Sequence, residues 1–175
     1  MMTEKMILSE SLEDYLETIL ELEKTNKVAR AKDIADKLGV RRGSVTGALK
    51  VLGQKKLINY EPYSFITLTT VGKRIAAKIK ERHTVLKRFL ERVLQVDPIT
   101  AEATACRMEH AIDDLSLDRL VCFIDYIYAC PRTGEDWIQS FVKHCKNKKI
   151  DLSDCDHCLD SCCKRLQSVS NKSGP

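Results

Sequence analysis

Apolar residues near the start of the chain recur with the spacing of amphipathic helices. Between positions 12 and 20 they follow an i, i+3, i+4, i+7, i+8 pattern, which predicts a helix with Ser9 or Ser11 as its cap. A second short helix is predicted over 31–38, and Gly39 ends it because glycine readily adopts the left-handed conformation that closes helices.

The next segment predicts a third helix and then a hairpin. Residues 41–57 place apolar side chains inward at 45, 49 and 52, as a helix does. Residues 57–69 are rich in β-branched and aromatic types, which predicts two short strands joined around 61–64.

The remainder of the chain reads as helical. A long helix is predicted over 71–96, and Asp97-Pro98 ends it and starts another that runs to about residue 114. Ser116 is expected to cap an apolar helix that ends at Cys130-Pro131, and a last short helix is predicted over 135–145. Residues 146–175 are polar and rich in cysteine, and their composition is typical of a disordered end.

Charge changes this picture because it is unevenly distributed. Residues 24–56 hold ten Lys or Arg against two Asp, a local balance of +8 within a net charge of +4. Residues 1–23 hold seven acidic residues against one Lys, and residues 96–129 hold seven against two Arg. This distribution predicts that the basic block binds a polyanion and that the acidic blocks bind cations. Helix faces that are merely exposed to solvent give the same pattern.

Composition excludes several classes of protein. The 175 residues are 43% hydrophobic and 31% charged, as in ordinary globular proteins. No run of about 18 uncharged apolar residues occurs, and the start turns acidic where a signal peptide needs its apolar core. We therefore expect a cytoplasmic protein with no membrane partner. No HExxH, serine elbow or phosphate-binding glycine loop occurs, so we do not expect an enzyme.

Helix, turn, helix and hairpin follow the order of a winged helix-turn-helix, whose second helix enters the major groove of DNA. That helix begins with cationic and hydroxyl side chains, which bond phosphates and base edges, and its outward Gly43 and Gly47 allow close approach. A helical bundle with a solvated basic face is the alternative. The predicted DNA-binding residues are Arg41, Arg42, Ser44, Thr46 and Lys50.

Potential metal ligands gather on the helices of the second half. Clustered acids repel unless a cation lies between them, so a helix face that carries two carboxylates, a thiol and an imidazole favours a metal site. His83 interrupts an apolar stripe, and Asp14 and Glu17 lie beside the apolar face of the first helix. Each residue alone also fits a structural role, but together they favour a metal. The ligands that share one face are Glu102, Cys106, Glu109 and His110.

Residues 9–142 resemble the diphtheria toxin repressor and manganese transport regulator family of metal-dependent repressors. The resemblance rests on EDYLETIL, AKDIADKLGVRRGSVTGALKVL, LTTVGKRIAAKIKERHTVLKRFL and ACRMEH. It implies a homodimer that binds double-stranded operator DNA when its metal site is filled. It also implies metal ligands at Asp14, His83, Cys106, Glu109 and His110, with Glu17 added from the manganese branch. Lys87 stands where iron-type members have an acidic ligand of a second site, and Glu102 stands where they have histidine.

The donor set bears on the choice of metal. A thiolate suits Fe²⁺ better than Mn²⁺, which prefers oxygen and imidazole, so Fe²⁺ is favoured and Mn²⁺ comes next. The alternative function is a winged-helix regulator that senses redox state through its thiols, with residues 102–110 as mere core.

The cysteines of the last third allow a further site. A tail site for Zn²⁺ or an iron–sulfur cluster competes with unstructured thiols and with a redox-sensitive pair. Its candidate ligands are Cys130, Cys145, Cys155, Cys158, Cys162 and Cys163.

These patterns predict a mainly α protein. Residues 1–72 are expected to form the winged helix-turn-helix with its small β-hairpin wing, and residues 73–146 an all-α dimerisation and metal-binding domain. Residues 147–175 form a Cys-rich tail, disordered or metal-binding. The expected function is a metal-dependent repressor of transcription that controls metal homeostasis.

Overall fold

The computed structural model describes residues 8–61, 64–130, 133, 135–148, 156, 159–164 and 167. The chain divides into two compact units, unit 1 over Met1–Thr84 and unit 2 over Val85–Pro175. Among the described residues, no helix combines the length and apolar character needed to cross a membrane.

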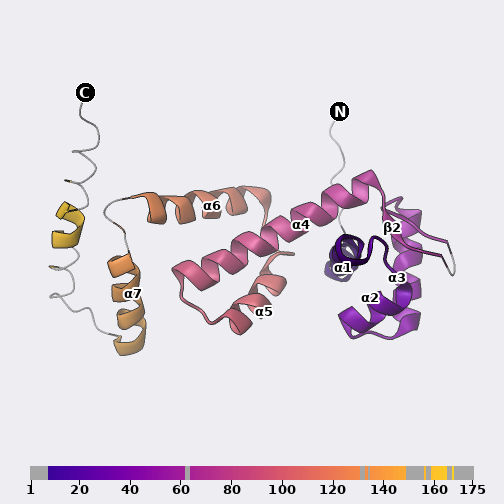
Figure 1. Cartoon of the computed structure of the whole chain (residues 1–175), viewed down its shortest axis with the longest axis horizontal. Helices are drawn as coiled ribbons and strands as arrows, with labels where there is room; N and C mark the ends of the chain where they lie inside the picture. Colours follow the sequence, from indigo (N-terminus) through magenta and orange to yellow (C-terminus); the bar gives the residue numbers. More distant parts are fainter. Residues whose placement is uncertain are drawn as a thin grey trace, which may run out of the picture. The chain divides into compact units, whose positions relative to one another are not determined.

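Unit 1 begins with three helices, as the periodicity predicts (Figure 1). They are α1 (Glu10–Asn26), α2 (Ala31–Leu38) and α3 (Arg42–Gln54). Ser9 stands at the N-cap of α1, but its side chain makes no capping hydrogen bond, so the expected serine cap is not formed. Gly39 ends α2 with φ 65°, and its N–H donates to the carbonyl of Ala35, as expected for a glycine C-cap.

The wing consists of β1 (Ile58–Asn59) and β2 (Thr67–Leu68), paired antiparallel with Ile58 opposite Leu68. The backbones of Ala29 and Ile66 exchange hydrogen bonds of 3.1 and 2.9 Å, which extends the pairing to the link between α1 and α2. The sequence pattern did not indicate this bridge. Residues 62 and 63 of the predicted turn lie outside the described residues.

The core of unit 1 draws on all of these elements, because each helix turns its apolar face toward the others and toward the wing. Its fully buried side chains include Leu16, Ile19, Ile34, Val45, Leu49, Leu52 and Leu57.

A joint between α3, the wing and α4 (Thr70–Arg88) completes unit 1. The Thr69 hydroxyl donates to the carbonyl of Lys56 (2.9 Å) and accepts from the N–H of Gly72 (3.1 Å). A Cβ atom on Gly72 would lie 2.0 Å from the carbonyl oxygen of Leu57, so only glycine allows this close approach.

Unit 2 departs from the predicted helix boundaries in several places. The helix expected to run from Pro98 to about residue 114 ends at Met108, because Asp113 starts a separate helix. The long helix expected to reach residue 96 ends as an α-helix at Arg88, and a π-helical turn, η1 (Phe89–Val93), follows it. Gln95 then adopts φ 55°, which turns the chain toward the next helix. Leu90 and Val93 lie within this wider turn and are both buried, so the turn keeps the apolar stripe in place.

The later helices are α5 (Pro98–Met108), α6 (Asp114–Ala129) and α7 (Glu135–Asn147). The expected cap of α6 at Ser116 is wrong. Asp113 is the N-cap, and its carboxylate accepts from the N–H of Ser116 (2.9 Å) and from the Ser116 hydroxyl (2.8 Å). Aspartate caps a helix as well as serine does, and the cap at Asp113 lies three residues before the predicted cap at Ser116.

Two small apolar clusters hold unit 2 together. One joins the end of α4 and η1 to α5, and the other joins η1 to α6 and α7. Residues 159–164 are helical and Cys162 is buried, whereas most of the predicted tail lies outside the described residues.

Candidate metal centre and DNA-binding surface

Unit 1 carries three of the predicted ligands at the edge of its core. Asp14 is half-buried on α1, and His83 is only 6% exposed on α4. Asp14 directly precedes Tyr15 and Leu16, which α1 buries, so its carboxylate lies beside the apolar face. Burial, and then the negative charge of Asp14, raise the pKa of Tyr15.

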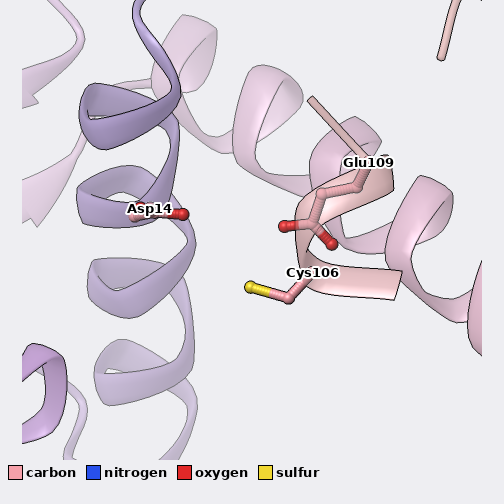
Figure 2. A group of neighbouring side chains, drawn as sticks. All are labelled: Asp14, Cys106 and Glu109. Carbon is pink, nitrogen blue, oxygen red and sulfur yellow. The ribbon is translucent and has the colours of Figure 1, made fainter. Parts of the chain in front are cut away.

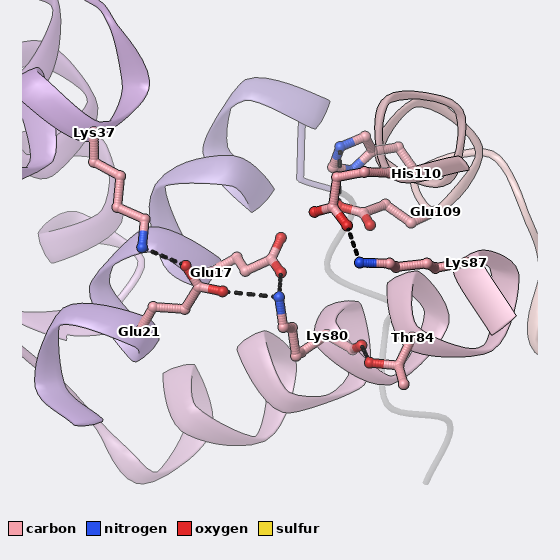
Figure 3. A network of polar contacts seen from close by, with 9 residues as sticks. Glu17, Glu21, Lys37, Lys80, Thr84, Lys87, Glu109 and His110 are labelled. Atoms are coloured by element: carbon pink, nitrogen blue, oxygen red, sulfur yellow. Dashed lines mark hydrogen bonds and ion pairs between the residues drawn. The ribbon is translucent and has the colours of Figure 1, made fainter. Parts of the chain in front are cut away.

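Glu17, the third predicted ligand of unit 1, belongs to an ion-pair network that joins α1, α2 and α4 (Figure 3). The Lys80 ammonium lies 2.9 Å from a Glu17 carboxylate oxygen and 2.8 Å from one of Glu21. Lys37 approaches the other oxygen of Glu21 to 2.6 Å. Burial lowers the pKa of Lys80, but the hydrogen bonds that it donates to Glu21 and Glu17 outweigh burial and raise that pKa well above its usual value.

Unit 2 brings three donor atoms together at the end of α5. The thiol of Cys106 and a carboxylate oxygen of Glu109 lie within 4.8 Å of each other. A carboxylate oxygen of Glu109 lies 3.6 Å from Nε2 of His110, and these two side chains are 0% and 6% exposed. Figure 2 shows Cys106 and Glu109 on this segment, and Asp14 on α1. A fully buried carboxylate needs a compensating charge, so this group fits a divalent cation.

Glu102, the remaining predicted ligand, makes a different contact. Its carboxylate lies 2.7 Å from the ammonium of Lys87, which also lies 3.8 Å from Glu91. Glu102 shares a helix face with Cys106, as its spacing predicts, but the residue that meets its carboxylate comes from another helix.

The predicted DNA-binding residues lie at the N-terminal end and on the outer face of α3. Arg41 is its N-cap, and all five predicted side chains are exposed, namely Arg41, Arg42, Ser44, Thr46 and Lys50. Val45, Leu49 and Leu52 bury the opposite face. The helix therefore leaves its basic and hydroxyl groups in solvent, as a DNA reader requires.

Two residues that position the wing escaped the sequence analysis. The Glu23 carboxylate accepts a 2.7 Å hydrogen bond from the N–H of Leu68, in β2. The Arg30 guanidinium lies 5.1 Å from the centroid of the Phe65 ring, a cation–π contact. Glu23 looked like one more acid on α1, and no local pattern distinguishes it.

The tail site stays a prediction. Cys130 is the half-buried C-cap of α6, and Cys145 is exposed in α7. Cys162 is buried and Cys163 is exposed, whereas Cys155 and Cys158 lie outside the described residues.

Two family descriptions match consecutive parts of the chain. Residues 7–66 match "Iron dependent repressor, N-terminal DNA binding domain", and residues 69–138 match "Iron dependent repressor, metal binding and dimerisation domain". The chain belongs to the iron-dependent repressor family. This is the family that includes the diphtheria toxin repressor and the manganese regulators, so the expected resemblance is confirmed.

Individual members of the iron-dependent repressor family agree with this assignment. The chain is 40% identical to the uncharacterized HTH-type transcriptional regulator MJ0568 of Methanocaldococcus jannaschii, over 67% of this chain and 95% of that protein. It is 36% identical to the HTH-type transcriptional regulator MntR of Listeria monocytogenes, over 63% of this chain and 77% of that protein.

Among solved structures, the manganese regulator SloR superposes with a TM-score of 0.60 at 28% identity. The match covers 69% of this chain and 56% of SloR, so the chain spans little more than half of that structure.

Membership of the iron-dependent repressor family confirms the predicted fold class, a winged helix followed by a helical domain. Its members are transcriptional repressors, which also confirms that the chain is not an enzyme. The coarse function, a metal-dependent repressor of transcription, follows from the family, and the thiol-sensing alternative is not favoured.

Proposed function

We propose that the chain represses transcription as a homodimer whose binding to operator DNA depends on Fe²⁺, or on Mn²⁺ as the next choice. The observation that carries this proposal is the donor group of unit 2, where the buried Glu109 lies beside Cys106 and His110. Asp14 and His83 stay predicted ligands of unit 1.

The choice of Fe²⁺ rests on Cys106. Thiolate is a softer donor than carboxylate, and it suits iron better than manganese. Against this, SloR is described as a manganese regulator. Control of metal homeostasis would follow if the ion that loads the site is also the one whose supply the target genes regulate.

The proposed switch is the fixation of the reader helix by the metal-binding residues. Asp14 lies on α1, which packs on α2 and α3 in the core of unit 1. A cation bound at Asp14 would fix α1, and through the core of unit 1 it would limit the orientations of α3. Converting a population from about 1:99 to 99:1 needs about 5.5 kcal/mol of differential binding. Structural metal sites supply about 10 kcal/mol or more.

The dimer is proposed to form through α6. This helix exposes Leu115, Phe123 and Tyr126, with exposed fractions of 67%, 47% and 53%. Large apolar side chains on one exposed helix are typical of interaction surfaces. In such a dimer, two copies of α3 would read half-sites about 34 Å apart, one turn of DNA.

The experiment that tests the proposal is anaerobic DNA binding with chelator-treated protein, to which Fe²⁺, Mn²⁺ or Zn²⁺ is added separately. We expect tight binding to genomic fragments only with metal, and its loss in Cys106→Ala and His110→Ala. Cys145→Ala is the matched control, because it removes an exposed thiol from α7. Equal binding with and without chelator would contradict the proposal.

A further inference from the structure

Two predicted ligands, Glu17 and Glu102, are bound to ammonium groups. Lys80 lies 2.9 Å from Glu17, and Lys87 lies 2.7 Å from Glu102. Each pair lies within one unit, Glu17 with Lys80 in unit 1 and Glu102 with Lys87 in unit 2.

Both lysines bind a second carboxylate as well. Lys80 reaches Glu21 at 2.8 Å, and Lys87 reaches Glu91 at 3.8 Å. Each ammonium therefore lies between two carboxylates, which is the place that a divalent cation would take between the same groups. Figure 3 shows Lys80 beside Glu17 and Glu21.

A fixed ammonium disfavours a metal ion at the same carboxylate. The Lys87 pair is partly exposed, at 37% and 53%, so it adds little to the stability of the fold. Its charge nevertheless lies at hydrogen-bond distance from the Glu102 oxygen. A divalent ion bound there would be repelled by that charge or would have to displace it.

The donors of the proposed site differ in chemistry from these two pairs. Cys106, Glu109 and His110 combine a thiol, a buried carboxylate and an imidazole. Such a mixed set is typical of a transition-metal site, whereas two carboxylates with a lysine between them are typical of a salt bridge.

We infer that each chain holds one divalent ion, and that Lys80 and Lys87, each within its own unit, occupy the places where a further ion would bind Glu17 or Glu102. Glu17 and Glu102 are then salt-bridge partners rather than metal ligands. This inference rests on the proposed function, and it removes Glu17 and Glu102 from the predicted ligand set.

The first test measures Mn²⁺ bound per chain by equilibrium dialysis and elemental analysis of the full chain. We expect one ion per chain. A value of two would overturn this inference and leave the proposed function intact, whereas no bound ion would overturn the proposed function itself.

The second test adds a carboxylate in place of an ammonium. Lys87→Glu would bring a third carboxylate to Glu91 and Glu102, and we expect the stoichiometry to rise from one Mn²⁺ to two. Lys146→Glu makes the same charge change at an exposed position of α7 and should leave the value at one. An unchanged stoichiometry in folded Lys87→Glu would overturn the role of Lys87.

The third test needs no second ion. If Glu102 and Glu17 bind lysine rather than metal, their replacement in Glu102→Gln and Glu17→Gln removes no ligand. The Mn²⁺ dissociation constant of each variant should therefore change less than twofold. Cys106→Ser should weaken binding by about tenfold or more. A tenfold loss in Glu102→Gln or Glu17→Gln would show that the altered carboxylate is a ligand and would overturn the inference for it.

Discussion

The Glu23 carboxylate on α1 accepts a hydrogen bond of 2.7 Å from the backbone N–H of Leu68 in the wing. The two residues are 45 positions apart, and the side chain of Glu23 is only 10% exposed. A side chain on α1 thus accepts the hydrogen bond of a backbone N–H in strand β2. This carboxylate of α1 therefore helps to hold the wing in position.

Replacing Glu23 by alanine should destabilise unit 1. The N–H of Leu68 would lose its partner, and an unsatisfied buried donor costs about 1–3 kcal/mol. Chemical denaturation of metal-free protein measures the loss in the free energy of unfolding. Glu81→Ala, which removes an exposed acid from α4, is the control and should change this free energy by less than about 0.5 kcal/mol. A similar free energy of unfolding for both variants would contradict the role given to Glu23.

Acid should weaken unit 1 through Glu21. Burial raises the pKa of Glu21, but its hydrogen bonds from Lys37 and Lys80 outweigh burial and hold the pKa below its usual value. A lowered pKa in the folded state means that the contribution is complete above the unfolded-state pKa, about 4.3. It is lost as the pH falls through the folded-state pKa.

The measurement compares unfolding of the metal-free wild type and Glu21→Gln between about pH 6 and pH 3. The wild type should lose more stability than the variant across this range, because the variant has no carboxylate to protonate. Parallel pH profiles would exclude Glu21 as the source.

Gly72→Ala should destabilise the joint between α4 and the wing. The added Cβ would lie 2.0 Å from the Leu57 carbonyl oxygen and 2.9 Å from its carbon, both backbone atoms. Relief requires a shift of α4 or β1, and overpacking of this kind costs about 1–3 kcal/mol or more. Thermal unfolding should show a lower Tm than in the wild type. Gly53→Ala, where the added carbon would meet only ordinary contacts near 3.8 Å, is the matched control.

Lys50→Ala should weaken DNA binding without regard to sequence. Its exposed ammonium on α3 is expected to contact phosphate, so the slope of log affinity against log salt should fall in magnitude by about one. Fluorescence anisotropy of metal-loaded protein at several salt concentrations measures that slope. Lys146→Ala in α7 removes the same charge from a helix outside the reader and should leave the slope unchanged.

The local patterns predicted most of the elements, because each helix buries one stripe of its own sequence. Periodicity placed α1, α2 and α3 within a few residues of their bounds, and Gly39 marked a real helix end. The pattern was wrong where two local structures have nearly equal stability, because packing then decides which of them forms. The π-helical turn at Phe89–Val93 is such a case, since its residues suit an α-helix equally well.

The sequence predicted the types of donor in the candidate site. It did not predict which residue each donor contacts. Spacing on one helix found Cys106, Glu109 and His110, but it also selected Glu102. The contact of Glu102 with Lys87 joins two helices, and helix periodicity carries no information about such pairs. The same limit applies to Glu23 and Leu68.

Gly43 and Gly47 leave open space on the outer face of α3, where no atom lies within 4 Å of a Cβ added to either. A glycine inside a helix is about 0.5–1 kcal/mol less stable than alanine, so side chains can be added here at no expense to folding. On the proposed function, these positions face the operator. New operator preferences can therefore arise by single substitutions that the fold tolerates, which lets a regulator of this kind diverge toward new target genes while its core stays the same.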